Sequence, residues 1–233
     1  MNPLWQQLAS RASVTLSQEQ LDRFDQYLTL LLAANDRMNL TRIDTLAEAE
    51  VGHVGDTLTL LPFLPPSAFT LADVGSGGGV PGIPLAISRP DARITLFEST
   101  QKKAVFLEET ARQLGLTNVK VSSNRAEVEA REQARDSFDI VTARALAAMN
   151  ILTEWCLPLV KVGGKLLAMK GGKVNDELPL AKRAIQTLGG ADPIVYPANL
   201  PGSDFHVIVE IKKLRPTDKR YPRPTAQIKE KPL

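Results

Sequence analysis

Cysteine, histidine and aromatic residues are scarce in this sequence. Its 233 residues include one cysteine, Cys156, and two histidines. A single cysteine allows no intrachain disulfide and no cysteine-ligated zinc cluster, as expected in a reducing compartment, so we expect a cytoplasmic protein without a metal site. No run approaches the roughly 20 apolar residues of a membrane span, and the N-terminus lacks the apolar core of a signal peptide. We therefore expect neither export nor membrane insertion.

Net charge is also small, at +2, but it is distributed unevenly. From Lys212 to the end of the chain there are eight basic residues and two acidic ones. That segment carries +6, so the remaining chain carries −4. The asymmetry favours a local contact with a polyanion, although a solvated tail that contacts nothing would have the same composition.

The length suits one α/β domain with an appended element, and 43% hydrophobic residues can form a substantial core. Residues 1–65 are predicted to be a helical extension. Ser17 is placed to cap an amphipathic helix with apolar residues from Leu21 to Leu32, and a second helix is predicted over 45–61. A proline-rich segment then marks a boundary. We expect the core over 66–213 and a basic tail over 214–233.

In the core, short apolar runs alternate with segments of helical spacing. Strands are predicted over 70–74, 93–97, 119–122, 138–142 and 165–169. Helices are predicted over 102–114, 150–160 and 174–188. This alternation predicts a parallel, doubly wound sheet. Two last strands, 193–196 and 206–212, have no helix between them and should form an antiparallel hairpin. We associate a Rossmann-like α/β sheet closed in this way with class I S-adenosylmethionine-dependent methyltransferases.

The segment LADVGSGGGVPGIPL, residues 71–85, gives the most information about the ligand of this protein. An apolar strand ends at Asp73, and the glycines that follow, Gly75 and Gly77 among them, allow positive φ and close approach of a ligand. The loop lacks the Lys and Ser/Thr of a triphosphate-binding loop. Glu98 follows Gly77 by 21 residues, at the end of the next predicted strand, where a carboxylate can bind two ribose hydroxyls. The pattern predicts a nucleoside cofactor.

Two cofactors fit this pattern. Gly77, Gly79 and Gly82 match the GxGxxG of nicotinamide-binding proteins. S-adenosylmethionine is favoured because Asp73 can bond the loop amides and complement a cationic cofactor. In addition, neither histidine is well placed for the acid–base work of hydride transfer. An NAD(P)-dependent oxidoreductase is the alternative, and a non-catalytic RNA-binding module is a third hypothesis.

Further segments resemble a known family. DVGSGGGVPGIPLAI at 73–87, SNRAE at 123–127, FDIVTARA at 138–145 and LPLVKVGGKLLAMKG at 157–171 are similar to the bacterial 16S ribosomal RNA guanine-N7 methyltransferases, formerly called glucose-inhibited division protein B. NLT at 39–41, HxxD at 53–56 and YPR at 221–223 extend the resemblance over nearly the whole chain. Family members often carry Arg where this chain has Gly52.

The resemblance implies methyl transfer from S-adenosylmethionine to N7 of a guanine in the decoding-centre loop of 16S ribosomal RNA. The partner would be that RNA or the small ribosomal subunit, and we expect a monomer. The resemblance also implies that five residues contact the cofactor, in addition to Asp73, Gly77 and Glu98: Gly75, Val80, Ala126, Glu127 and Arg144.

The residues of this sequence also indicate which atom of a base can be methylated. Cys156 lies within a predicted helix, so the nucleophilic cysteine of a cytosine-C5 enzyme is not expected. Exocyclic-amine enzymes typically have an Asn/Asp-Pro-Pro-aromatic turn where this chain has VTARALA. Guanine N7 has a free lone pair and no proton, so positioning suffices and we expect no catalytic base.

Basic residues near the carboxyl edge of the predicted sheet are candidates for positioning the cofactor and the RNA. Arg144 can brace the cofactor carboxylate or an RNA phosphate. Lys170 and Lys173 follow the fifth predicted strand, at the sheet edge where ligands bind, and are expected to hold RNA phosphates. We expect three residues of the tail to help position the RNA: Lys219, Arg220 and Arg223.

Overall fold

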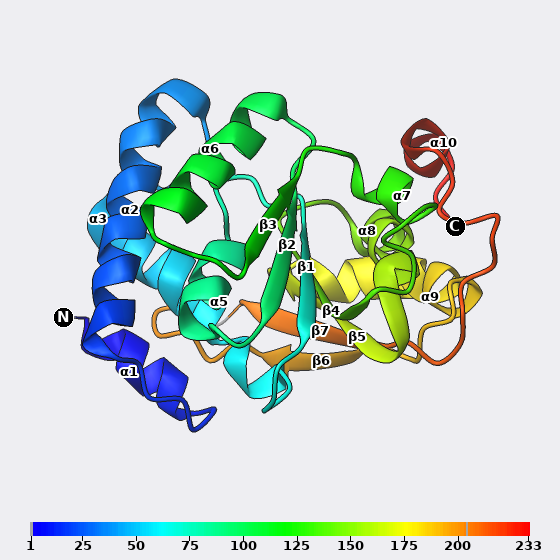
Figure 1. Ribbon diagram of the computed structural model, residues 1–233. Coiled ribbons are helices and arrows are strands. Elements are labelled where there is room, and N and C mark those ends of the chain that lie inside the picture. The colour runs from blue at the N-terminus through cyan, green and yellow to red at the C-terminus, as the bar shows by residue number, and fades with distance from the viewer. Residues whose placement is uncertain (1, 204) are drawn as a thin grey trace.

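One seven-stranded mixed sheet organises the computed structural model, which describes residues 2–203 and 205–233 (Figure 1). The strand order is β3-β2-β1-β4-β5-β7-β6, with β1 to β5 parallel and β7 antiparallel to both of its neighbours. The predicted Rossmann-like sheet with a terminal hairpin is confirmed. The strands are β1 Thr70–Val74, β2 Arg93–Phe97, β3 Val119–Ser122, β4 Phe138–Arg144, β5 Val160–Lys170, β6 Ile194–Pro197 and β7 Val207–Lys212.

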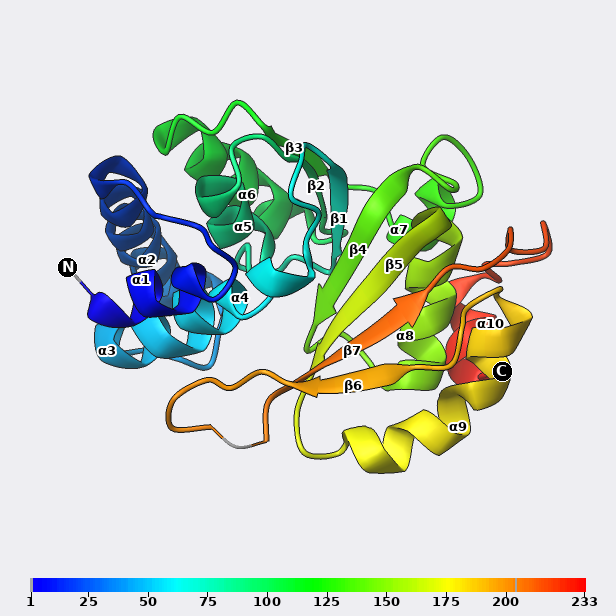
Figure 2. The same ribbon diagram turned by 90° about the horizontal axis from the view of Figure 1, so that it is seen from below.

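Helices cover both faces of this sheet (Figure 2). One hydrophobic cluster joins the N-terminal helices, α5 and α6 to one face, and a second joins the remaining helices to the other. The first face carries α1 Pro3–Ser10, α2 Gln18–Met38, α5 Gly82–Ser88 and α6 Gln101–Gln113. The second carries α7 Ala126–Glu129, α8 Met149–Cys156, α9 Val174–Thr187 and α10 Thr225–Glu230. The helical extension therefore shares a core with the sheet; its boundary at residue 65 stays a prediction.

Two predicted helices differ from the structure. The helix predicted over 150–160 ends at Cys156, followed by a 3₁₀ turn, Leu157–Leu159. Pro158 has no N–H for a helical hydrogen bond, so the chain turns there and β5 begins at Val160, five residues earlier than predicted. By contrast, α2 begins as predicted, because Ser17 Oγ accepts a hydrogen bond from the Gln20 N–H.

The helix predicted over 45–61 is present as contiguous helical residues over 46–58, but its centre is not α-helical. The segment comprises α3 Leu46–Ala49, a π-helical turn over Glu50–Gly55, and α4 Asp56–Leu58, with a 3₁₀ turn at Leu61–Phe63. Within the π turn, the Gly52 carbonyl accepts a hydrogen bond from Arg144 Nη1, 2.6 Å away at the end of β4. The departure from a regular α-helix thus lies where this segment contacts the sheet.

The basic tail is part of the folded domain, and a fully solvated tail is excluded. Ile228 of α10 is fully buried against the second face of the sheet. Arg131 and Arg135 donate hydrogen bonds to the carbonyls of Pro222 and Tyr221. No helix within the described ranges is long and apolar enough to cross a membrane.

Candidate functional site

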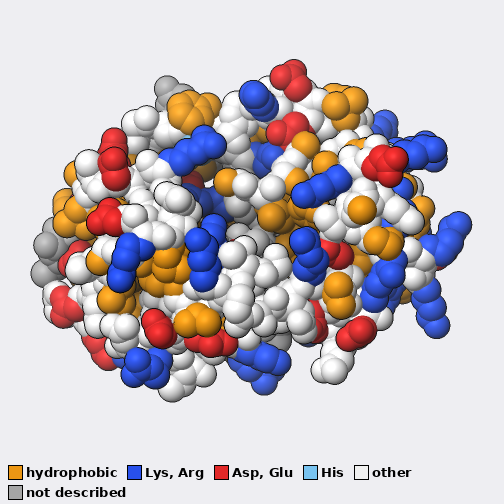
Figure 3. Space-filling model, turned by 90° about the horizontal axis from the view of Figure 1, so that it is seen from above, with side chains coloured by type: hydrophobic (Ala, Val, Ile, Leu, Met, Phe, Trp, Pro, Cys, Tyr) orange, Lys and Arg blue, Asp and Glu red, His pale blue; other side chains and the backbone are white. Residues whose placement is uncertain are grey.

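A cavity of about 870 Å³ lies at the carboxyl edge of β1, β2 and β4. Viewed onto this edge, the surface is hollowed, and Lys and Arg side chains border the hollow (Figure 3). All the predicted cofactor residues except Asp73 line it: Gly75, Gly77, Val80, Glu98, Ala126, Glu127 and Arg144. The topology thus gathers these residues from four separate segments, one at the carboxyl end of each of β1 to β4; their contact with the cofactor stays a prediction.

The glycine loop after β1 is held against the end of β2. The N–H groups of Gly75 and Ser76 both donate to the Phe97 carbonyl, at 2.9 and 3.1 Å. Glu98 accepts from the N–H of Gly77 at 3.0 Å and from that of Thr100 at 2.7 Å. Gly77 has a φ of +56°, and a Cβ added there would meet only the Gly75 carbonyl oxygen, at 3.9 Å. The loop therefore presents bare backbone to the cavity, as a closely bound nucleoside requires.

Asp73 supports this loop from beneath and does not line the cavity. It is fully buried, and its carboxylate accepts from the Gly82 N–H at 3.2 Å and from the Thr142 hydroxyl at 3.4 Å. Burial raises the pKa of Asp73 to about 6. The predicted bond to a loop amide is present. Because the carboxylate is buried and does not line the cavity, it supports the loop, and its contact with the cofactor stays a prediction.

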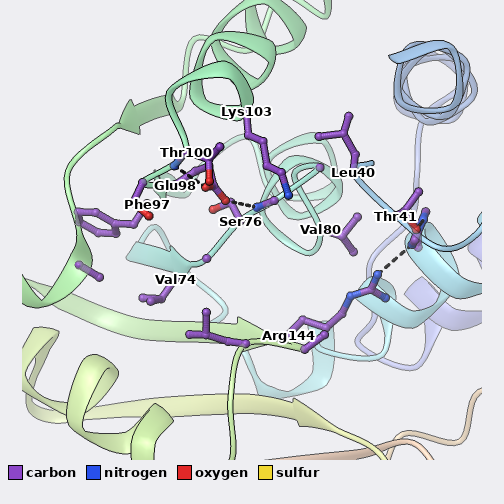
Figure 4. A pocket seen from close by; sticks show the side chains of 18 of the residues that line it. Leu40, Thr41, Val74, Ser76, Val80, Phe97, Glu98, Thr100, Lys103 and Arg144 are labelled. Carbon is purple, nitrogen blue, oxygen red and sulfur yellow. Dashed lines mark hydrogen bonds between the residues drawn. The ribbon is translucent and has the colours of Figure 1, made fainter. Parts of the chain in front are cut away.

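Arg144 reaches into the cavity from the end of β4, opposite Glu98 (Figure 4). Its Nη1 donates to Asp56 Oδ2 at 2.9 Å, and its Nη2 lies 2.9 Å from His53 Nδ1. Together with the bond to the Gly52 carbonyl, these contacts fix the guanidinium plane. Arg144 is therefore a rigidly placed cation beside the cavity, suited to a carboxylate ligand.

Both histidines line this cavity, although no catalytic or binding role was predicted for either. His53 is 1% exposed, and its Nε2 lies 3.0 Å from Thr41 Oγ1. His206 Nδ1 lies 3.4 Å from Asp56 Oδ1. His53 Nδ1 lies 2.9 Å from Arg144 Nη2, which can only donate, and 3.2 Å from the Gly52 carbonyl, which can only accept. The shorter contact favours the tautomer that accepts at Nδ1 and carries its proton on Nε2. The spacing of His53 and Asp56, three residues apart in a helical segment, was the available signal.

The adenine end predicted at Ala126 and Glu127 is the N-terminus of α7, where the C-terminal tail contacts the lining residue Glu127. Thr225 Oγ1 donates to Glu127 Oε1, and Arg125 Nη1 lies 3.7 Å from the same oxygen. Cys156 is fully buried and burial raises its pKa, so it is a structural thiol as predicted.

Comparisons with known proteins decide between the hypotheses. The family described as "GidB: rRNA small subunit methyltransferase G" matches residues 20–199. The chain belongs to this family. It is therefore an S-adenosylmethionine-dependent rRNA methyltransferase, and neither the oxidoreductase nor the non-catalytic module is retained.

Individual relatives agree with this family. Proteins named ribosomal RNA small subunit methyltransferase G from Limosilactobacillus reuteri and Lactobacillus delbrueckii are 39% and 40% identical, each match covering 100% of both chains. Among solved structures, a SAM-dependent methyltransferase from Aquifex aeolicus superposes with a TM-score of 0.57 at 13% identity, covering 76% of this chain and 97% of its own. That likeness shows the fold alone.

An rRNA methyltransferase needs basic side chains that are free to contact RNA phosphates, so the surroundings of the predicted RNA-binding residues decide which of them can do so. Lys170 is 11% exposed and engaged within the protein, with its Nζ 2.6 Å from Glu177 and 3.0 Å from the Ala147 carbonyl. Lys173 is exposed. Arg223 donates to Glu154, which is fully buried. Lys170 and Arg223 therefore hold the fold together, and only Lys173 of the three is available to a phosphate.

Lys219 and Arg220 lie apart from the cavity. Arg135, shortly before β4, donates to the carbonyls of Thr217 and Asp218, so the residues that follow lie near the amino end of that strand. Lys173 follows the carboxyl end of the parallel neighbour β5. The structure thus does not bring the tail cations together with Lys173, and the RNA contacts expected of Lys219 and Arg220 stay predictions.

The buried His53 gives a pH-dependent prediction. Burial, followed by the charge of Arg144, lowers its pKa from 6.5 to about 4. The unfolded chain therefore binds this proton more tightly, so the free energy of unfolding should fall as the pH drops from 6.5 towards 4, by about 3 kcal/mol from this group. Urea unfolding of the wild type and of His53→Asn, whose amide oxygen replaces Nδ1, should show a steeper loss for the wild type. Parallel pH profiles would contradict the assignment.

Proposed function

We propose that this chain transfers the methyl group of S-adenosylmethionine to N7 of one guanine in the decoding-centre loop of 16S rRNA. The observation that carries the proposal is the cavity in which the bare glycine loop, Glu98 and Arg144 converge, in a chain of this methyltransferase family. The substrate is 16S rRNA, free or within the small subunit, and the reaction takes place in the cytoplasm, where ribosomes are assembled.

Each part of the cavity suits one part of the cofactor. Glu98 accepts the ribose hydroxyls on lone pairs that its two backbone bonds leave free. Ala126 and Glu127 contact the adenine, and the loop at Gly75 and Gly77 lies against the centre of the molecule. Arg144 holds the cofactor carboxylate. When bound, S-adenosylmethionine supplies an electrophilic methyl group on its sulfonium.

The protein then acts by orientation. N7 carries a lone pair in the plane of the base and no proton, so no group on the enzyme has to remove one. In-line alignment can contribute roughly 7–11 kcal/mol. The absence of a required base agrees with the state of His53, which lies near the site. This histidine is neutral, and its ring nitrogens contact Thr41 and Arg144. The monomeric state stays a prediction, which sedimentation would check.

Methyl transfer is the direct test. The purified chain is incubated with methyl-labelled S-adenosylmethionine and with 16S rRNA or small subunits from cells that lack the enzyme. We expect one methyl group per RNA, which mass spectrometry places on N7 of a single guanine. RNA from cells that retain the enzyme is the control and should accept almost none. Label on another atom or on another base would refute the proposal.

A further inference from the structure

A second cavity, of about 580 Å³, adjoins the cofactor cavity and shares four lining residues with it: Arg42, Arg144, Ala145 and His206. The remaining wall comes mostly from the end of β5 and the start of β7, with Met169, Gly171 and Ile208 among its residues. Its volume lies within the range of about 300–1,000 Å³ that is usual for ligand sites.

The strand order shows which end of the cofactor faces this second cavity. Under the proposed function, adenine lies after β3 at Ala126 and ribose lies after β2 at Glu98. The cofactor then crosses the glycine loop after β1 and ends at Arg144 after β4. The second cavity continues in the same direction, from β4 to β5 and β7. It therefore lies beside the sulfonium end, where the acceptor must enter.

The mouth of this cavity is open, aromatic and basic. A Cβ added to Gly171 would meet nothing within 4 Å, and one added to Gly172 would lie 3.8 Å from the Cβ of Phe205. Phe205 is 59% exposed and packs edge-on against His206, with ring centroids 5.0 Å apart. Arg42 and Lys173 are exposed and make no ion pair among the described residues. Such a rim suits a base with phosphates on either side.

The chemistry of the acceptor requires a cavity of this kind. In an RNA helix, N7 faces a deep and narrow major groove that side chains cannot enter, whereas the bases of a loop can be splayed out. A guanine can meet the methyl group in line only after it has left its stack, as happens in other enzymes that modify bases. The unstacked base then needs an aromatic or apolar surface, and its neighbouring phosphates need cations.

We propose that the second cavity receives a single unstacked purine nucleotide of the RNA, with Phe205 stacking on its base and Arg42 and Lys173 contacting the flanking phosphates. This inference rests on the proposed function. It assigns Phe205 and Arg42, which the sequence did not indicate, and keeps Lys173 as an RNA contact while leaving Lys170 to the fold.

Filling the cavity is the first test. Gly171 does not have a positive φ, so a larger residue is sterically allowed there. Gly171→Leu should lower methyl transfer to 16S rRNA at least a hundredfold, with an unchanged affinity for S-adenosylmethionine by calorimetry. Gly171→Ala, which adds one methyl group, should keep most of the activity. If Gly171→Leu bound the cofactor and methylated RNA at the wild-type rate, the cavity assignment would be overturned.

The rim is tested separately, in case the first variant fails to fold. Phe205→Ala should raise the KM for RNA roughly tenfold or more, and Phe205→Tyr should restore it, because stacking needs only the ring. Arg42→Gln with Lys173→Gln should reduce the slope of log affinity against log salt by about 2. An unchanged KM and slope would overturn the rim assignments. If the wild type itself transferred no methyl to RNA, the proposed function would fail instead.

Discussion

Glu98→Ala is expected to weaken S-adenosylmethionine binding at least a hundredfold. The carboxylate fixes the N–H groups of Gly77 and Thr100, and in the proposed complex it also accepts both ribose hydroxyls. A hydrogen bond to a charged group contributes about 1.5–3 kcal/mol, so two ribose bonds alone correspond to about 3–6 kcal/mol. Calorimetric titration with S-adenosylmethionine and with S-adenosylhomocysteine measures the loss.

Two further variants sharpen this test. Glu98→Gln has nearly the same shape, but its NH₂ group would face a backbone N–H that needs an acceptor, so we expect an intermediate loss. Glu108→Gln removes an exposed carboxylate from the neighbouring α6 and should leave the affinity unchanged. An affinity of Glu98→Ala within threefold of the wild type would rule out the ribose assignment.

Glu154→Ala is expected to cause the largest loss of stability. Glu154 on α8 is fully buried and accepts three short hydrogen bonds from Arg223: from the backbone N–H at 2.8 Å, from Nε at 2.9 Å and from Nη2 at 2.7 Å. Removing one partner leaves a largely buried guanidinium unpaired, which costs about 3–5 kcal/mol. Since domains are stable by only about 5–15 kcal/mol, urea unfolding should resolve the change clearly.

A double variant separates the ion pair from packing. Glu154→Leu with Arg223→Leu removes both charges and should recover part of the stability, because apolar pairs often replace buried ion pairs without net loss. Limited proteolysis should show that the tail, residues 214–233, is cleaved faster in Glu154→Ala alone. A cost below 1 kcal/mol for the single variant would show that the pair contributes little.

Local patterns in the sequence were sufficient to predict the sheet and its cofactor loop. The first three strands lie within the predicted bounds, because alternating apolar runs and turn residues specify a strand over only a few neighbours. The glycines after Asp73 and the carboxylate at Glu98 could be placed for the same reason. The position of the glycines and that of the carboxylate both depend on residues within one βαβ unit.

Tertiary packing decided what surrounds that loop. Arg144 meets His53 across 91 positions and Arg223 meets Glu154 across 69, and no local pattern specifies either partner. The same is true of Lys170, whose charge suggested RNA but whose Nζ is held by Glu177. Whether a basic residue binds a ligand or a buried carboxylate depends on which strands and helices pack together. The sequence thus determined the chemistry of the cofactor loop, and the folded chain determined which charges remain free to meet the RNA.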